Sequence, residues 1–293
     1  MSDDGEASEQ PELPLAPTSL IRLEPGRAVE DVDEEIFLLW TLNSRSEHEG
    51  GLGYVNHSHD SLYIAIDGKS WSAAASEREL SGETIVKVFQ DVTSLRTARG
   101  NTGSVIWRST VHLAIQILQN RLFDLVSLAE ARVLELGAGT GALPALIASR
   151  ARSWLVTDQP ELMPLIDKNV HSLSNCRTRS LDWFDFLDSP SLHQTRLRTA
   201  SILEHLDGEL PDLIICCDCV YNPALFPALV ATLNAFTQPG HSMVLMACEM
   251  RSNESLSDFL RTWLESDSAW RMVSLEDRFD KGFTAFAAWK AES

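Results

Sequence analysis

The chain has 293 residues, of which 44% are hydrophobic, and a formal net charge of −18. This length allows one large domain with an appendage, and this composition allows a sizeable core. No apolar run is long enough to cross a bilayer, and the acidic first residues lack the hydrophobic segment of a secretory signal. The acidity disfavours binding to nucleic-acid phosphates. We therefore expect no membrane and no direct nucleic-acid partner, and a cytoplasmic location with the nucleus as a second compartment.

The N-terminal third is expected to differ from the rest of the chain. Residues 1–30 are rich in Asp, Glu, Pro and Ser, which predicts an acidic, largely disordered arm. Residues 1–35 hold eleven acids and two arginines, which suits a basic partner or merely aids solubility. Residues 31–98 are predicted to form a small helix and strand extension. Its predicted elements are a helix over 34–44 and strands over 61–66 and 84–89.

Residues 99–293 alternate short apolar runs with helical segments, which predicts an α/β fold with a doubly wound, mainly parallel sheet. The predicted strands are 133–136, 154–157, 178–181, 213–217, 243–248, 270–274 and 283–289. The predicted helices are 111–119, 142–149, 161–170, 223–236 and 255–265. Ser109 is the expected N-cap of the first helix. Residues 184–209 are predicted to be a long polar loop that holds at most a short helix.

Three glycines at alternate positions, Gly137, Gly139 and Gly141, follow the first of these core strands and precede a helix. Glycine lets the backbone approach a ligand where a Cβ would clash, and a helix start offers free N–H groups. Strand, glycine turn and helix therefore predict a nucleotide site, with a tight turn that binds no ligand as the alternative. The spacing differs from the G-x-G-x-x-G of dinucleotide folds, which disfavours a nicotinamide-dependent oxidoreductase.

Polar and aromatic residues follow the next three strands, where an open α/β sheet binds its ligand. Asp158 ends the second strand and could accept hydrogen bonds from ribose hydroxyls or cap the next helix. Trp183 follows the third strand and could stack on adenine or pack in the core. Asp218 and Tyr221 follow the fourth strand, with a helix cap and a packing residue as their alternatives.

The five cysteines predict neither a disulfide framework nor a metal site. Their number is odd, and most of them lie in or beside predicted strands. Cys216, Cys217 and Cys219 have no second Cys pair and no companion histidines, so small core residues are the better interpretation. We expect no bound metal.

Several of these motifs resemble those of known methyltransferases. Glu135, two residues before Gly137, completes a sequence that resembles motif I of the seven-strand S-adenosylmethionine (SAM) methyltransferases. Asp218-Cys-Val-Tyr221 resembles the D-x-x-Y motif of the family 16 methyltransferases, which are mainly protein-lysine methyltransferases. Leu181-Asp182-Trp183 and Trp107 match two further positions of that family, over roughly residues 100–290. The chain looks most like the fungal ribosomal lysine N-methyltransferase 5 branch. It departs from that branch in its glycine turn and in Glu249-Met-Arg251, which is similar to the E-x-R of other lysine-methylating members.

The resemblance implies a Rossmann-like, seven-strand SAM-dependent protein-lysine N-methyltransferase domain over residues 99–293. It implies that Asp218 and Tyr221 face the methyl group and the incoming lysine, with Asp218 a positioning residue first and a proton acceptor second. It implies a monomer that acts on a basic protein, such as a ribosomal protein. The residues that it assigns to SAM are Trp107, Glu135, Gly137, Ala138, Gly139, Asp158, Trp183 and Cys217. Two alternatives stay open: a methyltransferase of the same fold for a small molecule or another side chain, and a non-enzymatic binding module.

Overall fold

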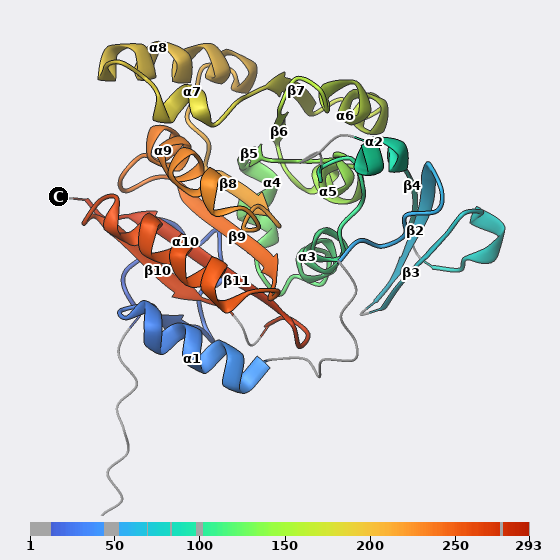
Figure 1. The fold of residues 1–293 in the computed structure, drawn as a ribbon, viewed down its shortest axis with the longest axis horizontal. Coiled ribbons are helices and arrows are strands. Elements are labelled where there is room, and N and C mark those ends of the chain that lie inside the picture. The colour runs from blue at the N-terminus through green and yellow to red at the C-terminus, as the bar shows by residue number, and fades with distance from the viewer. Residues whose placement is uncertain are drawn as a thin grey trace, which may run out of the picture.

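The computed structural model describes residues 13–43, 53–68, 70–82, 84–97, 102–275 and 278–292. An eight-stranded sheet runs through its centre in the order β1-β10-β11-β9-β8-β5-β6-β7, with helices on both faces (Figure 1). The strands are β1 (Arg27–Ala28), β5 (Arg132–Leu136), β6 (Ser153–Asp158), β7 (Cys176–Ser180), β8 (Leu213–Cys217), β9 (Met243–Glu249), β10 (Trp270–Ser274) and β11 (Phe283–Lys290).

The sheet is parallel in its larger part. β7, β6, β5, β8 and β9 are parallel neighbours, whereas β11 is antiparallel to β9, β10 to β11 and β1 to β10. This arrangement confirms the predicted α/β fold with a mainly parallel sheet, and the seven strands from β5 to β11 are the predicted ones. The carboxyl ends of the parallel strands meet at one edge, so the residues that follow β5, β6 and β8 lie near one another.

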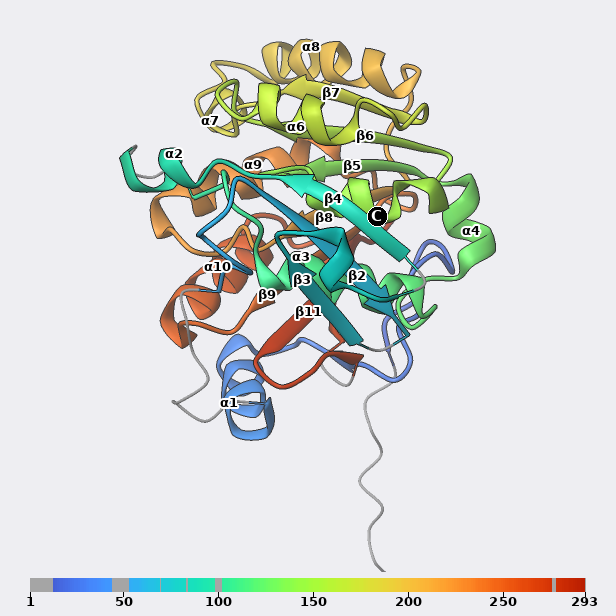
Figure 2. The same ribbon diagram turned by 90° about the vertical axis from the view of Figure 1, so that its right-hand side faces the viewer.

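Helices cover both faces of the sheet, as central parallel strands require (Figure 2). The helices are α1 (Val32–Asn43), α2 (Val92–Thr97), α3 (Arg108–Leu118), α4 (Leu125–Glu130), α5 (Ala142–Ile147), α6 (Met163–Val170), α7 (Phe184–Leu187), α8 (Leu192–Leu203), α9 (Phe226–Phe236) and α10 (Asn253–Glu265). Alternate residues of β5 show the two layers: Val133 belongs to the core cluster with α3, α5 and α6, whereas Leu134 belongs to the cluster with α9 and α10. Within the described residues, no helix is long and apolar enough to cross a membrane.

A small antiparallel sheet of order β3-β2-β4 packs outside α3, α5 and α6 (Figures 1 and 2). Its strands are β2 (Ser61–Asp67), β3 (Ser70–Ala74) and β4 (Thr84–Phe89). Asn169 of α6 ties it down, because its amide donates to the carbonyl of Phe89 at 2.8 Å and accepts from the N–H of Phe89 at 2.8 Å. The predicted strands of the extension are therefore present, and they pack against the main domain.

The prediction that residues 1–30 are largely disordered is wrong for the part that the structure describes; residues 1–12 lie outside it. Leu20 and Ile21 are buried, with exposed fractions of 4% and 2%, and Ile21 forms a β-bridge with Phe123. Arg27 lies in β1 at the edge of the main sheet and donates to Glu35 at 2.9 Å. The prediction failed because the segment is acidic and rich in proline on average, whereas a few of its apolar residues pack in the core.

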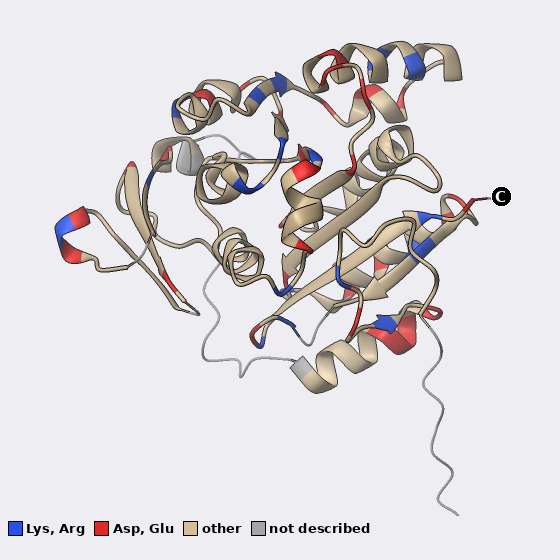
Figure 3. Ribbon diagram, turned by 180° about the vertical axis from the view of Figure 1, so that it is seen from behind, with Lys and Arg blue, Asp and Glu red and all other residues tan. Residues whose placement is uncertain are grey.

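Two local predictions within the main domain are also wrong. Residues 184–209 contain α7 and the twelve-residue helix α8, which packs through buried residues such as Ile202 and Leu203. Ser191 caps α8 by accepting from the N–H of Gln194. Ser109 is not the N-cap of α3: that position is Trp107, and Ser109 is buried inside the helix. Figure 3 shows most charged residues on helices and loops, whereas the strands of the sheet are mostly uncharged.

Candidate functional site

The glycine turn after β5 has the conformation that its sequence predicts. Gly137, Gly139 and Gly141 all have positive φ, at 70°, 60° and 74°. A Cβ at Gly137 would lie 3.0 Å from the ring of Trp183, and one at Gly139 would lie 2.9 Å from the carbonyl oxygen of Gly103. Only glycine therefore lets the backbone turn here while its neighbours stay this close.

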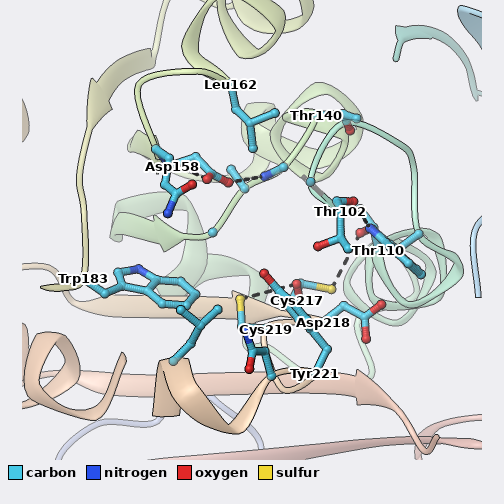
Figure 4. A pocket seen from close by; sticks show the side chains of 18 of the residues that line it. Thr102, Thr110, Thr140, Asp158, Leu162, Trp183, Cys217, Asp218, Cys219 and Tyr221 are labelled. Carbon is cyan, nitrogen blue, oxygen red and sulfur yellow. Dashed lines mark hydrogen bonds between the residues drawn. The ribbon is translucent and has the colours of Figure 1, made fainter. Parts of the chain in front are cut away.

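A cavity of about 340 Å³ opens beside this turn, at the carboxyl ends of β5, β6 and β8. Figure 4 shows Asp158, Trp183, Asp218 and Tyr221 around it. The structure brings all of the predicted site residues except Glu135 to its lining: Trp107, Gly137, Ala138, Gly139, Asp158, Trp183, Cys217, Asp218 and Tyr221. Residues that the sequence analysis did not assign to the site also line it, among them Thr102, Gly103, Thr110, Gln159, Asp182 and Arg251.

Asp158 holds the glycine turn in place. One carboxylate oxygen accepts from the N–H of Gly139 at 2.7 Å, and the other accepts from the N–H of Gln159 at 2.7 Å. Burial raises the pKa of Asp158 to about 6, although both backbone hydrogen bonds oppose the shift. α6 begins only at Met163, and Leu162 is its N-cap, so Asp158 is not the helix cap of the alternative interpretation.

Glu135 lies beneath the cavity and not on its lining. Its side chain is 2% exposed and accepts from the indole N–H of Trp154 at 2.9 Å. Burial raises the pKa of Glu135 to about 8, and the hydrogen bond from Trp154 only partly offsets this. Glu135 thus supports β5 and β6 from within the core, close to the turn that begins at Gly137.

The wall contributed by β8 is uncharged. Cys217 donates its thiol toward the hydroxyl of Thr110 at 3.8 Å, and burial raises the pKa of Cys217 well above its ordinary value. Cys219 donates to the carbonyl of Leu136 at 3.3 Å. The cysteines therefore behave as small neutral core residues, and among the residues that the structure describes no cluster of His, Cys, Asp and Glu could hold a metal ion.

Thr102 joins two of the predicted site residues. The indole N–H of Trp107 donates to the carbonyl of Thr102 at 2.9 Å, and Tyr221 is hydrogen-bonded to the side chain of Thr102. Desolvation raises the pKa of Tyr221, against the opposite effect of that hydrogen bond. The phenol therefore stays protonated at neutral pH, and Thr102 links Trp107 to Tyr221 at the lining of the cavity.

Asp218 is the end of a chain of four alternating charges. The residue as a whole is 8% exposed, and Arg251 donates to both oxygens of its side chain, at 2.8 and 2.6 Å. Arg251 also donates to Glu249 at 3.1 Å, and Glu249 accepts from Arg108 at 2.6 Å. We call these four residues the charge network. The φ of Asp218 is +60°, so a sharp turn after β8 directs this carboxylate to Arg251.

Arg251 is the site residue that the sequence analysis named but did not place. Its only signal was the E-x-R pattern after the strand now seen as β9. Its guanidinium carbon lies 4.8 Å from the ring of Trp107. Burial acts to lower the pKa of Arg251, but Asp218 outweighs it and the net shift is upward, so the guanidinium stays charged.

The N-terminal extension reaches the charge network through Gly53. Its carbonyl accepts from the backbone N–H of Arg108 at 2.8 Å, and its φ is +95°. A Cβ at Gly53 would overlap the side chains of Arg251 and Glu249. The next residue, Tyr54, forms a β-bridge with Trp107, and their rings lie 6.1 Å apart. The extension therefore contacts Trp107 and the charge network beside the cavity.

Comparison with known proteins identifies the family. The model of methyltransferase family 16, described as lysine methyltransferase, matches residues 90–266. A diaminohydroxyphosphoribosylamino-pyrimidine deaminase of Schizosaccharomyces pombe is 26% identical over 82% of this chain and 53% of its own length. Protein-lysine N-methyltransferase EFM3 of Chaetomium thermophilum is 32% identical over 57% of this chain and 48% of its own. EEF1A lysine methyltransferase 3 of Mus musculus is 29% identical over 45% and 51%. The chain spans about half the length of these relatives.

Proposed function

The chain belongs to the lysine methyltransferase family, as its D-x-x-Y motif predicted, and we propose from this premise that it is a SAM-dependent protein-lysine N-methyltransferase. The proposal rests on one observation: the glycine turn, Asp158, Trp183, Asp218 and Tyr221 all line the same cavity. One end of this arrangement suits a nucleoside, and the other offers a carboxylate and a phenol that could orient an amine.

The residues of the cavity fit SAM. Its volume of about 340 Å³ is of the size that binds small cofactors. Each oxygen of Asp158 accepts one backbone hydrogen bond, and a carboxylate oxygen has a second lone pair with which it could accept from a ribose hydroxyl. The indole of Trp183 would stack on the adenine, and the backbone from Gly137 to Gly139 would face the ligand at close range. SAM, when bound, supplies an electrophilic methyl group.

The remaining residues suit a lysine acceptor. Methyl transfer is an in-line displacement, so positioning the amine contributes much of the rate. A lysine side chain has a reference pKa of about 10.4, so most of it is a cation at neutral pH and must lose a proton before it can attack. Asp218 would orient the amine, and Tyr221 would add an aromatic wall and a hydroxyl. We place Asp218 as a positioning residue first.

The substrate that we propose is a basic protein. The net charge of −18 favours encounter with a cationic partner. Ribosomal proteins are basic and are one candidate; elongation factor 1A, named in the mouse relative, is another. We also propose that the protein is a monomer and that it lies in the cytoplasm, with the nucleus as a second compartment. The deaminase activity is named for the fission yeast relative, of which this chain covers only 53%, and it is not part of this proposal.

The experiment that tests this proposal combines cofactor binding with labelling. Calorimetry should detect S-adenosylhomocysteine but not NAD, and tritiated SAM with a fungal extract should label a protein band. Asp158→Ala should weaken S-adenosylhomocysteine binding at least about tenfold through loss of the ribose acceptor and of the brace on Gly139. Label that enters only small molecules would contradict the choice of a protein substrate, and absence of cofactor binding would contradict the whole proposal.

A further inference from the structure

This inference rests on the proposed function and concerns one problem in it, the effect of a carboxylate on the deprotonation of the substrate lysine. A bare carboxylate beside a substrate lysine would favour the ammonium form and would therefore oppose the loss of its proton. Asp218 is not bare in this structure, because the two nitrogens at the tip of Arg251 bind its two oxygens. The negative charge nearest to the acceptor site is thus already paired.

The charges of these four side chains sum to zero. Asp218 and Glu249 supply two negative charges, and Arg251 and Arg108 supply two positive ones. All four side chains are largely buried, with exposed fractions of 4%, 8%, 30% and 20% in that order. Their mutual attraction is therefore screened less than that of surface pairs. Arg251 is the central member, since it contacts both carboxylates and also lines the cavity.

The other titratable groups around Asp218 and Arg251 come from β6, β8, β9 and the loop after β8: Asp158, Cys217, Cys219, Tyr221 and Cys248. Burial raises the pKa of Asp158 to about 6 and that of Cys248 to about 12. The pKa values of Cys217 and Cys219 lie well above the ordinary value of a thiol, and that of Tyr221 is also raised. These raised pKa values keep the three thiols and the phenol mainly protonated up to about pH 9. Glu135 of β5, with a pKa of about 8, titrates within the tested range, but it is present in every variant compared.

We propose that Arg251 is a positioning residue that fixes Asp218 and cancels its charge, so that the substrate amine loses its proton at a lower pH than it would beside an unpaired carboxylate. Asp218 keeps its orienting role through the lone pairs that do not face Arg251. Glu249 accepts from both Arg251 and Arg108, and Gly53 of the extension packs against Arg251 and Glu249.

A second arginine provides a matched control for this role. Arg132, at the opposite end of β5, donates to Asp212 at 3.0 and 3.1 Å and is 19% exposed. It has the same two-point pairing with a partly buried aspartate, but it does not line the cavity beside the glycine turn. Loss of Arg132 should therefore show the structural cost of breaking such a pair without any effect on the acceptor site.

The test is the pH profile of methyl transfer. The initial rate of tritium transfer from SAM to a pool of fungal ribosomal proteins and purified elongation factor 1A is measured from pH 6.5 to 10. In the wild type the rate should rise with pH to a plateau. In Arg251→Met the midpoint of the profile should move upward by about one to two pH units. At a pH below the midpoint, the rate should then be about tenfold to hundredfold lower than that of the wild type. In Arg251→Lys the midpoint should stay within about half a unit while the plateau falls, because lysine keeps the charge but not the two-point contact.

Glu249→Gln gives the prediction of opposite sign. Removing this negative charge leaves the network with an excess positive charge, so the midpoint should move to lower pH by about half a unit to one unit. Arg132→Met should lower stability and leave the midpoint unchanged. Calorimetry with S-adenosylhomocysteine identifies any variant that no longer folds or binds the cofactor product. The midpoints of the remaining variants then test the role of Arg251.

Two failures are distinguishable. Wild-type protein that binds S-adenosylhomocysteine but labels no protein would overturn the proposed function, and this inference with it. Wild-type protein that labels a substrate, with Arg251→Met and Glu249→Gln at the wild-type midpoint or shifted in the same direction, would overturn only the role of Arg251.

Discussion

Replacing Glu135 by glutamine tests whether the carboxyl group beneath the glycine turn carries a proton in the folded protein. Burial raises its pKa from 4.5 to about 8. The folded state then binds this proton more tightly than the unfolded state does. The stability associated with it is fully present below about pH 4.5 and is lost as the pH rises to about 8. The glutamine side chain would be neutral at every pH and could still accept from Trp154.

The magnitude follows from the width of this window. Each pH unit inside it changes the free energy of unfolding by about 1.4 kcal/mol for one proton. Between pH 5.5 and pH 7.5 the wild type should therefore lose about 3 kcal/mol relative to Glu135→Gln. Asp158, whose pKa is raised to about 6, is present in both proteins, so its own contribution largely cancels in the difference.

Urea unfolding followed by tryptophan fluorescence at pH 5.5, 6.5 and 7.5 measures this difference directly. The free energies of unfolding of the two proteins should diverge steadily with rising pH, with the variant gaining on the wild type. A difference that is the same at pH 5.5 and pH 7.5 would mean that Glu135 is ionised throughout, and would refute the reasoning from burial.

Three further predictions test other parts of the structure. Gly139→Ala should weaken S-adenosylhomocysteine binding by at least about tenfold in calorimetry, because the new Cβ would meet a backbone oxygen. Gly208→Ala is the control, since Gly208 has a similar positive φ but lies in open space; equal affinities of the two variants would contradict the close approach. Gly53→Ala should lower the rate of methyl transfer by about tenfold with unchanged cofactor affinity. Gly68→Ala is the control, because a Cβ at Gly68 would contact no other atom; equal transfer rates of the two variants would show that the extension does not act on the site. Ile21→Ala should cost about 2–5 kcal/mol in urea unfolding, and a loss below about 0.5 kcal/mol would show that the N-terminal segment is not packed.

The edge of the sheet that carries the site was predictable from the sequence. Apolar runs that alternate with helices define a parallel sheet, and the ligand edge of such a sheet is set by topology. Gly137, Asp158, Trp183 and Asp218 each lie at or just after the end of a strand, so their convergence needed no knowledge of side-chain packing. The structure places all four on the cavity.

The contacts made by these residues were not predictable. Arg251 pairs with Asp218 across 33 positions of the chain, and Asp218 has a left-handed backbone conformation that is uncommon for residues other than glycine. Glu135 stands beside the glycine motif in the sequence, but the register of β5 with β6 directs its side chain to Trp154 in the core. Which side chains contact each other depends on how the elements pack, and the spacing of residues in the sequence does not reveal this.

Segments of unusual composition misled the sequence analysis for a related reason. Helix α8 buries only a narrow stripe that includes Thr199 and Ile202, so its average polarity is that of a loop. Leu20 and Ile21 lie in a segment dominated by acids and prolines, yet both are buried. In each case a few side chains determine the structure, and composition averages them away.

The central claim is that this cavity directs a methyl group to the side-chain nitrogen of a lysine in a basic protein. Peptide mass spectrometry of the band labelled by wild-type protein and deuterated SAM tests it most directly. The account predicts the labelled methyl group on a lysine side chain, and its loss with Asp218→Ala. A labelled methyl group on any other atom, or full labelling by Asp218→Ala, would contradict it.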